Sequence, residues 1–356
     1  MIGKATLTID LAKIAENART VVGALPGVDV IGVTKVTCGS PQIARAMLAG
    51  GVAGIGESRL ENVERLRAAG VACPFWLLRA PTPELAEDTV QLTDVSLQSE
   101  IETVAALDRA CERTGARHRI IAMVDLGDSR EGMMPADLPA FLDAVNPFVH
   151  VKVAGIGTSL TCYGAIVPDE ANLGELVELA HAAELQLGRK LVVSGGMSST
   201  LDALGAGTMP AEIDNLRVGE AIVLGVSPVT RERILGLHTD AIALAAPVIE
   251  CKIKPSLPRG VSAQDAFGGR PEFEDRGNRR RAICAIGRQD APPGGLVPID
   301  PRIKVLGASS DHLILDVDDL DRAPQVGEAI RFLPGYSATL ALFTSPYVVK
   351  EWVGGE

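Results

Sequence analysis

The sequence predicts a (β/α)8 barrel of the TIM type followed by a C-terminal all-β domain. Between residues 10 and 225, short aliphatic runs alternate with stretches rich in Ala, Leu, Glu and Arg, which is typical of alternating strands and helices. No GxGxxG follows the first strand, whereas a Gly-rich turn occurs near the last ones. This favours a barrel over a doubly wound sheet. After residue 228 the helical patterns give way to Pro, Gly and β-branched residues, which indicates a change to antiparallel strands.

The barrel domain is expected to span residues 10–227. Its expected strands are 28–34, 54–56, 75–79, 94–97, 118–125, 151–157, 190–194 and 216–218. The helices between them include 41–49, 59–69, 99–114, 137–145 and 173–187. The second domain is expected to span 228–356 and to include residues 1–9, because 6–9 read as a strand that precedes the first barrel helix. Its other expected strands are 245–254, 281–286, 304–306, 312–317 and 329–332.

Length, charge and composition narrow the classes of protein. A chain of 356 residues usually forms more than one core. The net charge is −11, and the one basic cluster, 276–281, is short, so nucleic acid is not an expected partner. No apolar stretch reaches the length of a membrane span, and residues 1–6 lack a signal-peptide pattern. The six cysteines form no CxxC pair and the histidines no HxxxH or HxH. We therefore expect a cytoplasmic protein with reduced thiols and no metal site.

The first candidate for chemistry is a lysine at the end of the first barrel strand. Lys35 follows the apolar run 28–34 and precedes a Gly-Ser-Pro turn. The C-terminal ends of barrel strands carry the active site, and a partly desolvated amine there has a lowered pKa and is suited to forming a Schiff base. The alternative is a structural lysine that reaches the rim or pairs with a carboxylate.

Two further segments come near the last strands. The run 193–200, V-S-G-G-M-S-S-T, joins a strand end to a helix start, where small residues and hydroxyls can hold a phosphate. An ordinary Ser-capped helix is the alternative. In 215–220, Arg217 would end the last strand and Gly219 would permit close backbone approach. An arginine keeps its protons, so it would hold a facing ring nitrogen unprotonated. An ordinary ion pair is the other interpretation.

Two polar loops complete the candidates. In 124–132, Arg130 could bind a substrate carboxylate through two hydrogen bonds, unless the loop is simply a solvated turn. In 305–312, within the second domain, Asp311 and His312 are candidates for substrate binding and proton transfer. A polar hairpin would explain this second loop equally well.

Together and in this order, these segments resemble the alanine racemase-like enzymes of fold type III, which use pyridoxal 5′-phosphate. Lys35 is similar to the family's cofactor lysine, and Arg217-Val218-Gly219 to its R-x-G segment. Residues 125–132, D-L-G-D-S-R-E-G, are similar to the family's D-T-G-M-x-R-x-G. The resemblance implies that Arg217 faces the pyridine nitrogen. It also implies a homodimer, in which the loop beginning at Gly307 reaches the partner's active site. Further residues implied in cofactor binding are Ser194, Gly196, Ser198, Ser199, Gly219 and Tyr336.

Several segments resemble the ornithine racemase subgroup of this family. They are 123–128, 160–165, 254–258 and 307–312. The family's second base, a tyrosine, is replaced by Arg288, so another group must serve the opposite face of the substrate. Residues 307–311 also resemble the loop of related diamino-acid decarboxylases, which puts Ser310 at a proton donor's position and Asp311 where the distal amine binds.

The resemblance implies an amino-acid racemase that interconverts L- and D-ornithine or a related basic amino acid. Lys35 would move the Cα proton on one face, and Ser310 or His312 from the other subunit on the opposite face. Arg130 would hold the carboxylate, and Asp128, in place of a methionine, would add to the preference for a diamino acid. A decarboxylase is one alternative, because Glu220 could supply the carboxylate that those enzymes place at the pyridine nitrogen. The other is a non-catalytic carrier of the cofactor, which the second domain disfavours.

Overall fold

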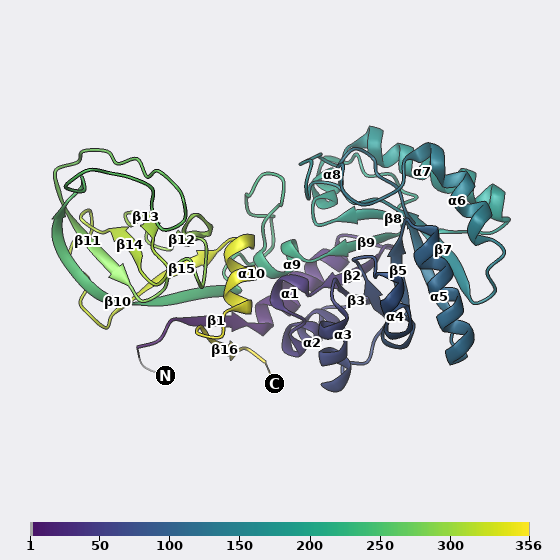
Figure 1. Cartoon of the computed structure of the whole chain (residues 1–356), viewed down its shortest axis with the longest axis horizontal. Coiled ribbons are helices and arrows are strands. Elements are labelled where there is room, and N and C mark those ends of the chain that lie inside the picture. Colours follow the sequence, from purple (N-terminus) through teal and green to yellow (C-terminus); the bar gives the residue numbers. More distant parts are fainter. Residues whose placement is uncertain (1–2, 356) are drawn as a thin grey trace. The chain divides into compact units, whose positions relative to one another are not determined.

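The structure is a computed structural model, and it describes residues 3–355 (Figure 1). The chain forms two compact units. The barrel unit contains residues 11–239 and residue 355, and the β unit contains the segment up to Asp10 together with 240–354. Within the described residues, every helix is too short or too polar to cross a bilayer.

Eight parallel strands close into a barrel in the order β2 to β9. They are β2 (Asp29–Val33), β3 (Gly54–Glu57), β4 (Phe75–Leu77), β5 (Val95–Gln98), β6 (His118–Met123), β7 (Val151–Gly157), β8 (Val192–Met197) and β9 (Asn215–Val218). Each strand pairs with the next, and β9 pairs back with β2, with Ile31 opposite Arg217. The predicted (β/α)8 barrel is confirmed, and all eight strand ends of one polarity lie on one rim.

Helices follow the strands around the barrel (Figure 1). They are α1 (Leu11–Gly23), α2 (Pro41–Ala49), α3 (Leu60–Ala68), α4 (Ala86–Leu92), α5 (Ile101–Thr114), α6 (Leu138–Val145), α7 (Glu170–Leu187), α8 (Thr200–Ala206) and α9 (Glu220–Leu224). Strand β7 and helix α2 have the predicted bounds. Strand β8 differs, because it continues three residues past the predicted end at Ser194, to Met197. This added stretch contains a register shift against β9 between Ser194 and Met197, at the two glycines.

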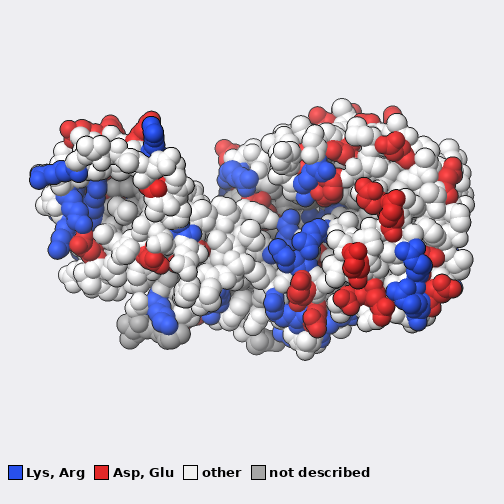
Figure 2. Space-filling model, in the orientation of Figure 1, with Lys and Arg blue, Asp and Glu red and all other residues white. Residues whose placement is uncertain are grey.

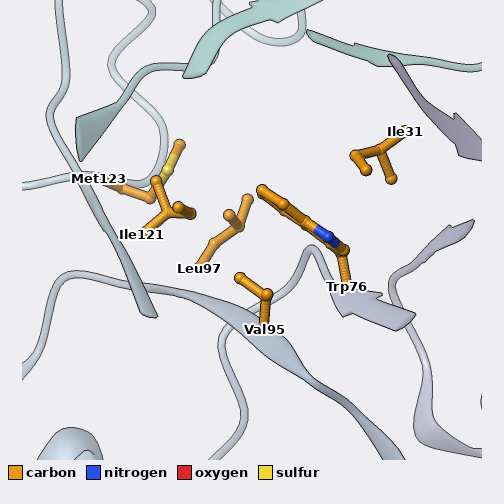
Figure 3. Packing of buried hydrophobic residues seen from close by; sticks show 6 residues of the cluster. All are labelled: Ile31, Trp76, Val95, Leu97, Ile121 and Met123. Atoms are coloured by element: carbon orange, nitrogen blue, oxygen red, sulfur yellow. The ribbon is translucent and has the colours of Figure 1, made fainter. Parts of the chain in front are cut away.

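The barrel interior is filled by aliphatic and aromatic side chains from alternate positions of neighbouring strands. The buried cluster consists of Ile31, Trp76, Val95, Leu97, Ile121 and Met123. Figure 3 shows these side chains converging from β2, β4, β5 and β6. Residues two apart on one strand, such as Val95 and Leu97, share a face. The packed interior leaves the rim as the place for polar chemistry.

The β unit is built on a six-strand path in the order β12-β15-β10-β11-β14-β13. Its strands are β1 (Thr6–Asp10), β10 (Ile242–Pro255), β11 (Asn278–Cys284), β12 (Leu296–Pro298), β13 (Lys304–Ala308), β14 (Leu313–Asp316), β15 (Ala329–Pro334) and β16 (Val349–Val353). The strand expected at 6–9 does belong here, since β1 pairs with β10. Two features depart from an all-antiparallel domain: β16 runs parallel to β1, and α10 (Tyr336–Thr344) is a helix. Nine mostly apolar residues are too few to show a helical period in sequence.

The basic run at 276–281 is tied into the β unit by ion pairs. Arg276 and Arg279 contact Asp316 at 2.9 and 3.0 Å, and Arg279 also contacts Asp318 and Asp319. Figure 2 shows Lys and Arg gathered over the β10–β11 end of this unit, with acidic residues beside them. Much of the basic charge that stands out in the sequence is therefore compensated within the fold.

A buried asparagine joins the two ends of the barrel unit. Asn17, on α1, donates from Nδ2 to the carbonyl oxygens of Ile222 and His238, each at 2.9 Å. Its Oδ1 accepts from the backbone N–H of His238 at 2.7 Å. Asn17 is fully buried, so no solvent can replace these partners if the amide is removed.

Replacing Asn17 with alanine should therefore leave buried backbone groups unsatisfied. We expect Asn17→Ala to lower the free energy of unfolding by about 2–4 kcal/mol, because each orphaned buried group costs about 1–3 kcal/mol. Urea denaturation monitored by circular dichroism measures this loss. Asn146→Ala, at an exposed position after α6, is the control. Equal urea midpoints for Asn17→Ala and Asn146→Ala would contradict the stabilising role of the Asn17 hydrogen bonds.

Candidate active site

Lys35 lies on the rim at the C-terminal end of β2. The strand ends at Val33, Thr34 precedes a single 3-10 turn at Lys35–Thr37, and α2 begins at Pro41. The side chain of Lys35 is half-buried. Its place on the rim is the one expected for a barrel's catalytic amine.

A buried carboxylate next to this lysine was not identified from the sequence. Glu57 ends β3 and is fully buried. Its Oε1 accepts from Thr34 Oγ1 at 2.6 Å, and its Oε2 from Asn62 Nδ2 at 3.0 Å and from the Ser58 N–H at 3.2 Å. Burial raises the pKa of Glu57, while these hydrogen bonds and the charge of Lys35 oppose the rise. A charged residue that ends a glycine-rich strand is the sequence signal that could have revealed it.

Arg217 is a buried cation surrounded by neutral oxygens. It lies on β9 with 3% of its surface exposed. Its Nη2 donates to the Thr158 carbonyl at 2.5 Å and to Ser159 Oγ at 3.3 Å, and its Nη1 donates to Ser194 Oγ. Burial lowers the pKa of Arg217 to about 10, with the nearby Glu131 charge opposing the shift. The group therefore keeps its positive charge at neutral pH.

The turn at 194–200 has features of an anion cradle. Gly196 has a φ of +106°, and a Cβ there would lie 2.7 Å from Thr200 Oγ1. Ser199 Oγ is buried without a hydrogen-bond partner among the described residues. Such a group is expected to meet a ligand or water. Ser198 Oγ instead accepts from the N–H groups of Gly219 and Ala221, each at 3.2 Å, and so joins this turn to the next one.

Gly219 packs closely against the strand that carries the lysine. A Cβ at this position would lie 3.0 Å from the Val33 carbonyl oxygen. The structure thus brings the predicted segment 193–200, the segment 217–219 and the end of β2 together on the rim. Ser199 supplies an unpaired polar atom, and the buried Arg217 a cation, so these residues fit a phosphorylated pyridine cofactor.

The loop after β6 is compact and charged. A bridge between Val124 and Met133 closes it, and Gly132 has a φ of +131° where a Cβ would lie 2.6 Å from the Asp125 nitrogen. Arg130 is exposed, and its Nε lies 2.7 Å from Glu131 Oε2. Arg130, which is predicted to bind the substrate carboxylate, therefore lies at the rim in an ion pair with Glu131.

Asp128 has partners that the sequence did not suggest. It is 1% exposed, and its two oxygens accept from the N–H groups of Tyr163 and Gly164, each at 3.0 Å. These bonds join the loop after β6 to the loop after β7. Both loops contain left-handed residues, Ser129 (φ 53°), Thr161 (φ 70°) and Ala165 (φ 55°). The part of Asp128 in substrate binding stays a prediction, and the contacts that it makes in the structure are structural.

Glu220, the residue that kept a decarboxylase possible, is also paired. Its Oε1 lies 2.6 Å from Arg231 Nη1. Burial raises the pKa of Glu220, and the charges of Arg231 and Lys35 oppose the rise.

The other predicted residues belong to the β unit. Ser310, Asp311 and His312 are exposed in the hairpin between β13 and β14, where Ser310 Oγ donates to Asp311 Oδ2 at 2.7 Å. Tyr336 is half-buried at the start of α10.

Arg288, which the resemblance puts at the position of the family's tyrosine, lies beside this hairpin. Its N–H donates to the Ser309 carbonyl at 2.8 Å. Its guanidinium stacks 4.3 Å from the centre of the Phe267 ring and lies 3.8 Å from Asp265 Oδ2.

The barrel rim can hold an anionic aromatic cofactor and present an amine to it. Among residues 3–355, no three His, Cys, Asp or Glu side chains are grouped to hold a metal ion. An amine, a buried cation and a hydroxyl-lined turn are the groups needed to bind a carbonyl cofactor and move a proton next to it.

Comparison with known families gives a match over most of the chain. Residues 9–228 match the model of the alanine racemase N-terminal domain. A crystal structure of alanine racemase from Bartonella henselae with covalently bound pyridoxal phosphate superposes with a TM-score of 0.75 at 19% identity, covering 98% of this chain and 99% of that one. At this identity the likeness concerns the fold.

Two relatives are similar over nearly their whole length. An ornithine racemase from Acetoanaerobium sticklandii is 39% identical over 349 residues, which are 97% of this chain and 98% of that protein. A lysine racemase from Thermotoga maritima is 41% identical over 354 residues, with the same coverage of each.

The contacts of Asp128 predict a local effect of removing its charge. In Asp128→Asn, an amide N–H would face one of the two backbone N–H groups and lose that bond. We expect the Tyr163 amide to exchange with deuterium about tenfold to a hundredfold faster, since a lost bond to a charged group costs about 1.5–3 kcal/mol. The Gly164 amide should change less, because its N–H also donates to the Asp128 backbone carbonyl at 3.0 Å. Hydrogen exchange with mass spectrometry measures this rate, and Asp137→Asn is the control. Unchanged protection at 163–164 would show that Asp128 does not hold the loop.

Proposed function

The chain belongs to the alanine racemase family, and we propose that it racemises a basic amino acid, ornithine or lysine, with pyridoxal 5′-phosphate as its cofactor. The observation that carries this proposal is the near-full-length similarity to an ornithine racemase and to a lysine racemase. Both relatives, by their names, act on amino acids with a second amine. The substrate proposed here has that same chemistry.

The rim of the barrel supplies the groups for this reaction. When bound, the cofactor withdraws electrons from the amino acid and acidifies the proton on Cα. Lys35 would carry the covalent link to it and would take up or return the Cα proton on one face. Ser199 Oγ, with Ser194, Gly196, Ser198 and Gly219, would line the phosphate end, and Tyr336 is proposed to contribute there.

Arg217 is proposed to face the ring nitrogen. Its charge disfavours protonation of that nitrogen, because the two positive charges would be close together in a buried site. A neutral ring withdraws electrons less strongly. Return of the proton to Cα is then favoured over reactions that store the electrons in the ring.

The opposite face needs a second proton carrier, and we propose that a homodimer provides it. Ser310 or His312 from the partner subunit would serve this face, and Asp311 would bind the distal amine of the substrate. Their exposure supports the idea that the hairpin is available to a second copy. Arg130 would hold the substrate carboxylate, and Asp128 would add to the preference for a substrate with a second amine.

The alternatives are less well supported. A diamino-acid decarboxylase would place a carboxylate at the ring nitrogen, whereas Glu220 is paired with Arg231 at 2.6 Å. A carrier protein would not need the β unit. We also propose a cytoplasmic location, which the six free cysteines support.

The decisive experiment is an exchange assay in heavy water. The protein loaded with pyridoxal phosphate is incubated with L-ornithine, L-lysine and L-alanine, and each product is analysed by chiral chromatography with mass detection. We expect D-ornithine or D-lysine carrying deuterium at Cα, and a loss of at least about a thousandfold in Lys35→Ala, which lacks both the covalent link and the base. Putrescine or cadaverine with loss of carbon dioxide would establish the decarboxylase. If no amino acid exchanges its Cα proton, the result would favour the alternative of a non-catalytic cofactor carrier.

The shared site predicts complementation between inactive variants. Lys35→Ala lacks the barrel base, and Asp311→Ala lacks a hairpin group. If each site combines one barrel with the partner's hairpin, a mixed dimer contains one site with both groups intact. We expect a 1:1 mixture, unfolded and refolded together, to recover about a quarter of wild-type activity, since half of the dimers are mixed and each holds one intact site. A mixture no more active than its components would overturn the shared site.

A further inference from the structure

We propose that Glu57 is a positioning residue that fixes the direction of Lys35 and favours the protonated form of its link to the cofactor. The inference rests on the proposed function in one respect, namely that Lys35 carries the cofactor. Glu57 itself touches neither cofactor nor substrate in this scheme, and it acts through its neighbours on β2 and α3.

Strand pairing places Glu57 beside the lysine turn. Val33 on β2 lies opposite Gly56 on β3, and the Thr34 N–H donates to the Gly56 carbonyl at 3.2 Å. The next residue of each strand is Thr34 on one side and Glu57 on the other. Their side chains bond at 2.6 Å, so the residue before Lys35 is tied to the carboxylate through its backbone and its hydroxyl.

The same network reaches the far end of the turn. Asn62, which donates to Glu57 at 3.0 Å, packs against Gly39 so closely that a Cβ there would lie 2.7 Å from Asn62 Cβ. Asn62 Oδ1 also accepts from Arg65 Nη1 at 2.9 Å, and Arg65 donates to the Cys38 carbonyl. The five residues from Thr34 to Cys38 are therefore held at both ends, with Glu57 as the common anchor.

The bonding pattern at Glu57 is that of an ionised carboxylate. Three donors converge on its two oxygens, from Thr34, Asn62 and the Ser58 backbone. An ionised carboxylate accepts all three bonds, whereas a protonated carboxyl would need the Thr34 hydroxyl to accept, since the two N–H groups can only donate. In a change to glutamine, the amide nitrogen can donate to Thr34 Oγ1 while the amide oxygen accepts from Asn62 and Ser58, so the substitution removes the charge and keeps the contacts.

The charges around Lys35 decide how strongly Glu57 acts. Glu57 faces Lys35 from β3, and Glu220 acts on it from α9, where Arg231 neutralises much of its charge. Arg65, on α3, adds positive charge to the network through Asn62, and Arg217 is the cation of the neighbouring strand β9. Because Glu220 is paired to Arg231, the charge of Glu57 is expected to act more strongly on Lys35. Removing the charge of Glu57 should favour the neutral form of the link between Lys35 and the cofactor.

A pH titration of the loaded protein tests this inference. The covalent link between Lys35 and pyridoxal phosphate changes its absorbance when it loses a proton. We expect the midpoint in Glu57→Gln to lie lower than in the wild type by about one pH unit, a tenfold weaker hold on the proton. The turnover number should fall about tenfold, with KM changed less than about threefold, because substrate contacts are retained. Borohydride reduction and mass spectrometry confirm that the link is at Lys35.

Two further variants keep the test independent of folding. Thr34→Val removes the tether and keeps the charge, so we expect a lower turnover number and a midpoint close to that of the wild type. Asp214→Asn is the control: this exposed carboxylate precedes β9 at the opposite rim and accepts from the Val193 N–H at 2.8 Å. It should leave both readouts unchanged.

The outcomes are separable. A wild-type midpoint in Glu57→Gln overturns the charge part of the inference, and wild-type turnover in Thr34→Val overturns the tether. If the wild-type protein forms no link at Lys35, the proposed function fails instead. If Glu57→Gln does not fold, a lowered turnover number in folded Thr34→Val still supports the tether.

Discussion

The pairing of β9 with β2 is the constraint on which the candidate site depends. It joins the last strand of the barrel to the first and sets Arg217 opposite Ile31. The same closure packs Gly219 against Val33. The cation, the glycine turn and the lysine strand come from the two ends of the barrel unit, and only a closed barrel makes them neighbours. Binding a cofactor across this seam would add a further link between the ends of the sheet.

Arg217 and Glu57 are ionisable groups buried on this rim, and each is solvated by the protein. Carbonyl and hydroxyl oxygens surround Arg217, and three hydrogen-bond donors surround Glu57. Burial of a charge is costly unless the surrounding dipoles replace water. Dipoles fixed in this way do not have to reorganise when charge moves during a reaction. Burying these charges lowers the stability of the fold, and the fixed dipoles would lower the barrier of the chemical step.

The sequence predicted the barrel, the second domain and the family, all of which are confirmed, because the hydrophobic periodicity and the spaced motifs are local signals. It did not predict Glu57, since a single acidic residue after Gly-Ile-Gly has no periodicity, and its importance comes from a neighbouring strand. The two backbone partners of Asp128 lie in a different loop, so no local pattern could reveal them. Helix α10 was missed because a short apolar segment fits a strand equally well. The roles of the individual site residues stay predictions.

The hydrogen bonds of Asp128 limit how the loops on this rim can be changed by substitution or exchange. Because its two oxygens hold the backbone of Tyr163 and Gly164, the loops after β6 and β7 form one mechanical piece. Residues with left-handed backbone conformation in both loops restrict the conformations that either loop can adopt. Exchange of one loop for that of a relative would separate a buried carboxylate from its partners. In evolution or in engineering, the two loops should therefore be inherited together, as a single exchangeable cassette.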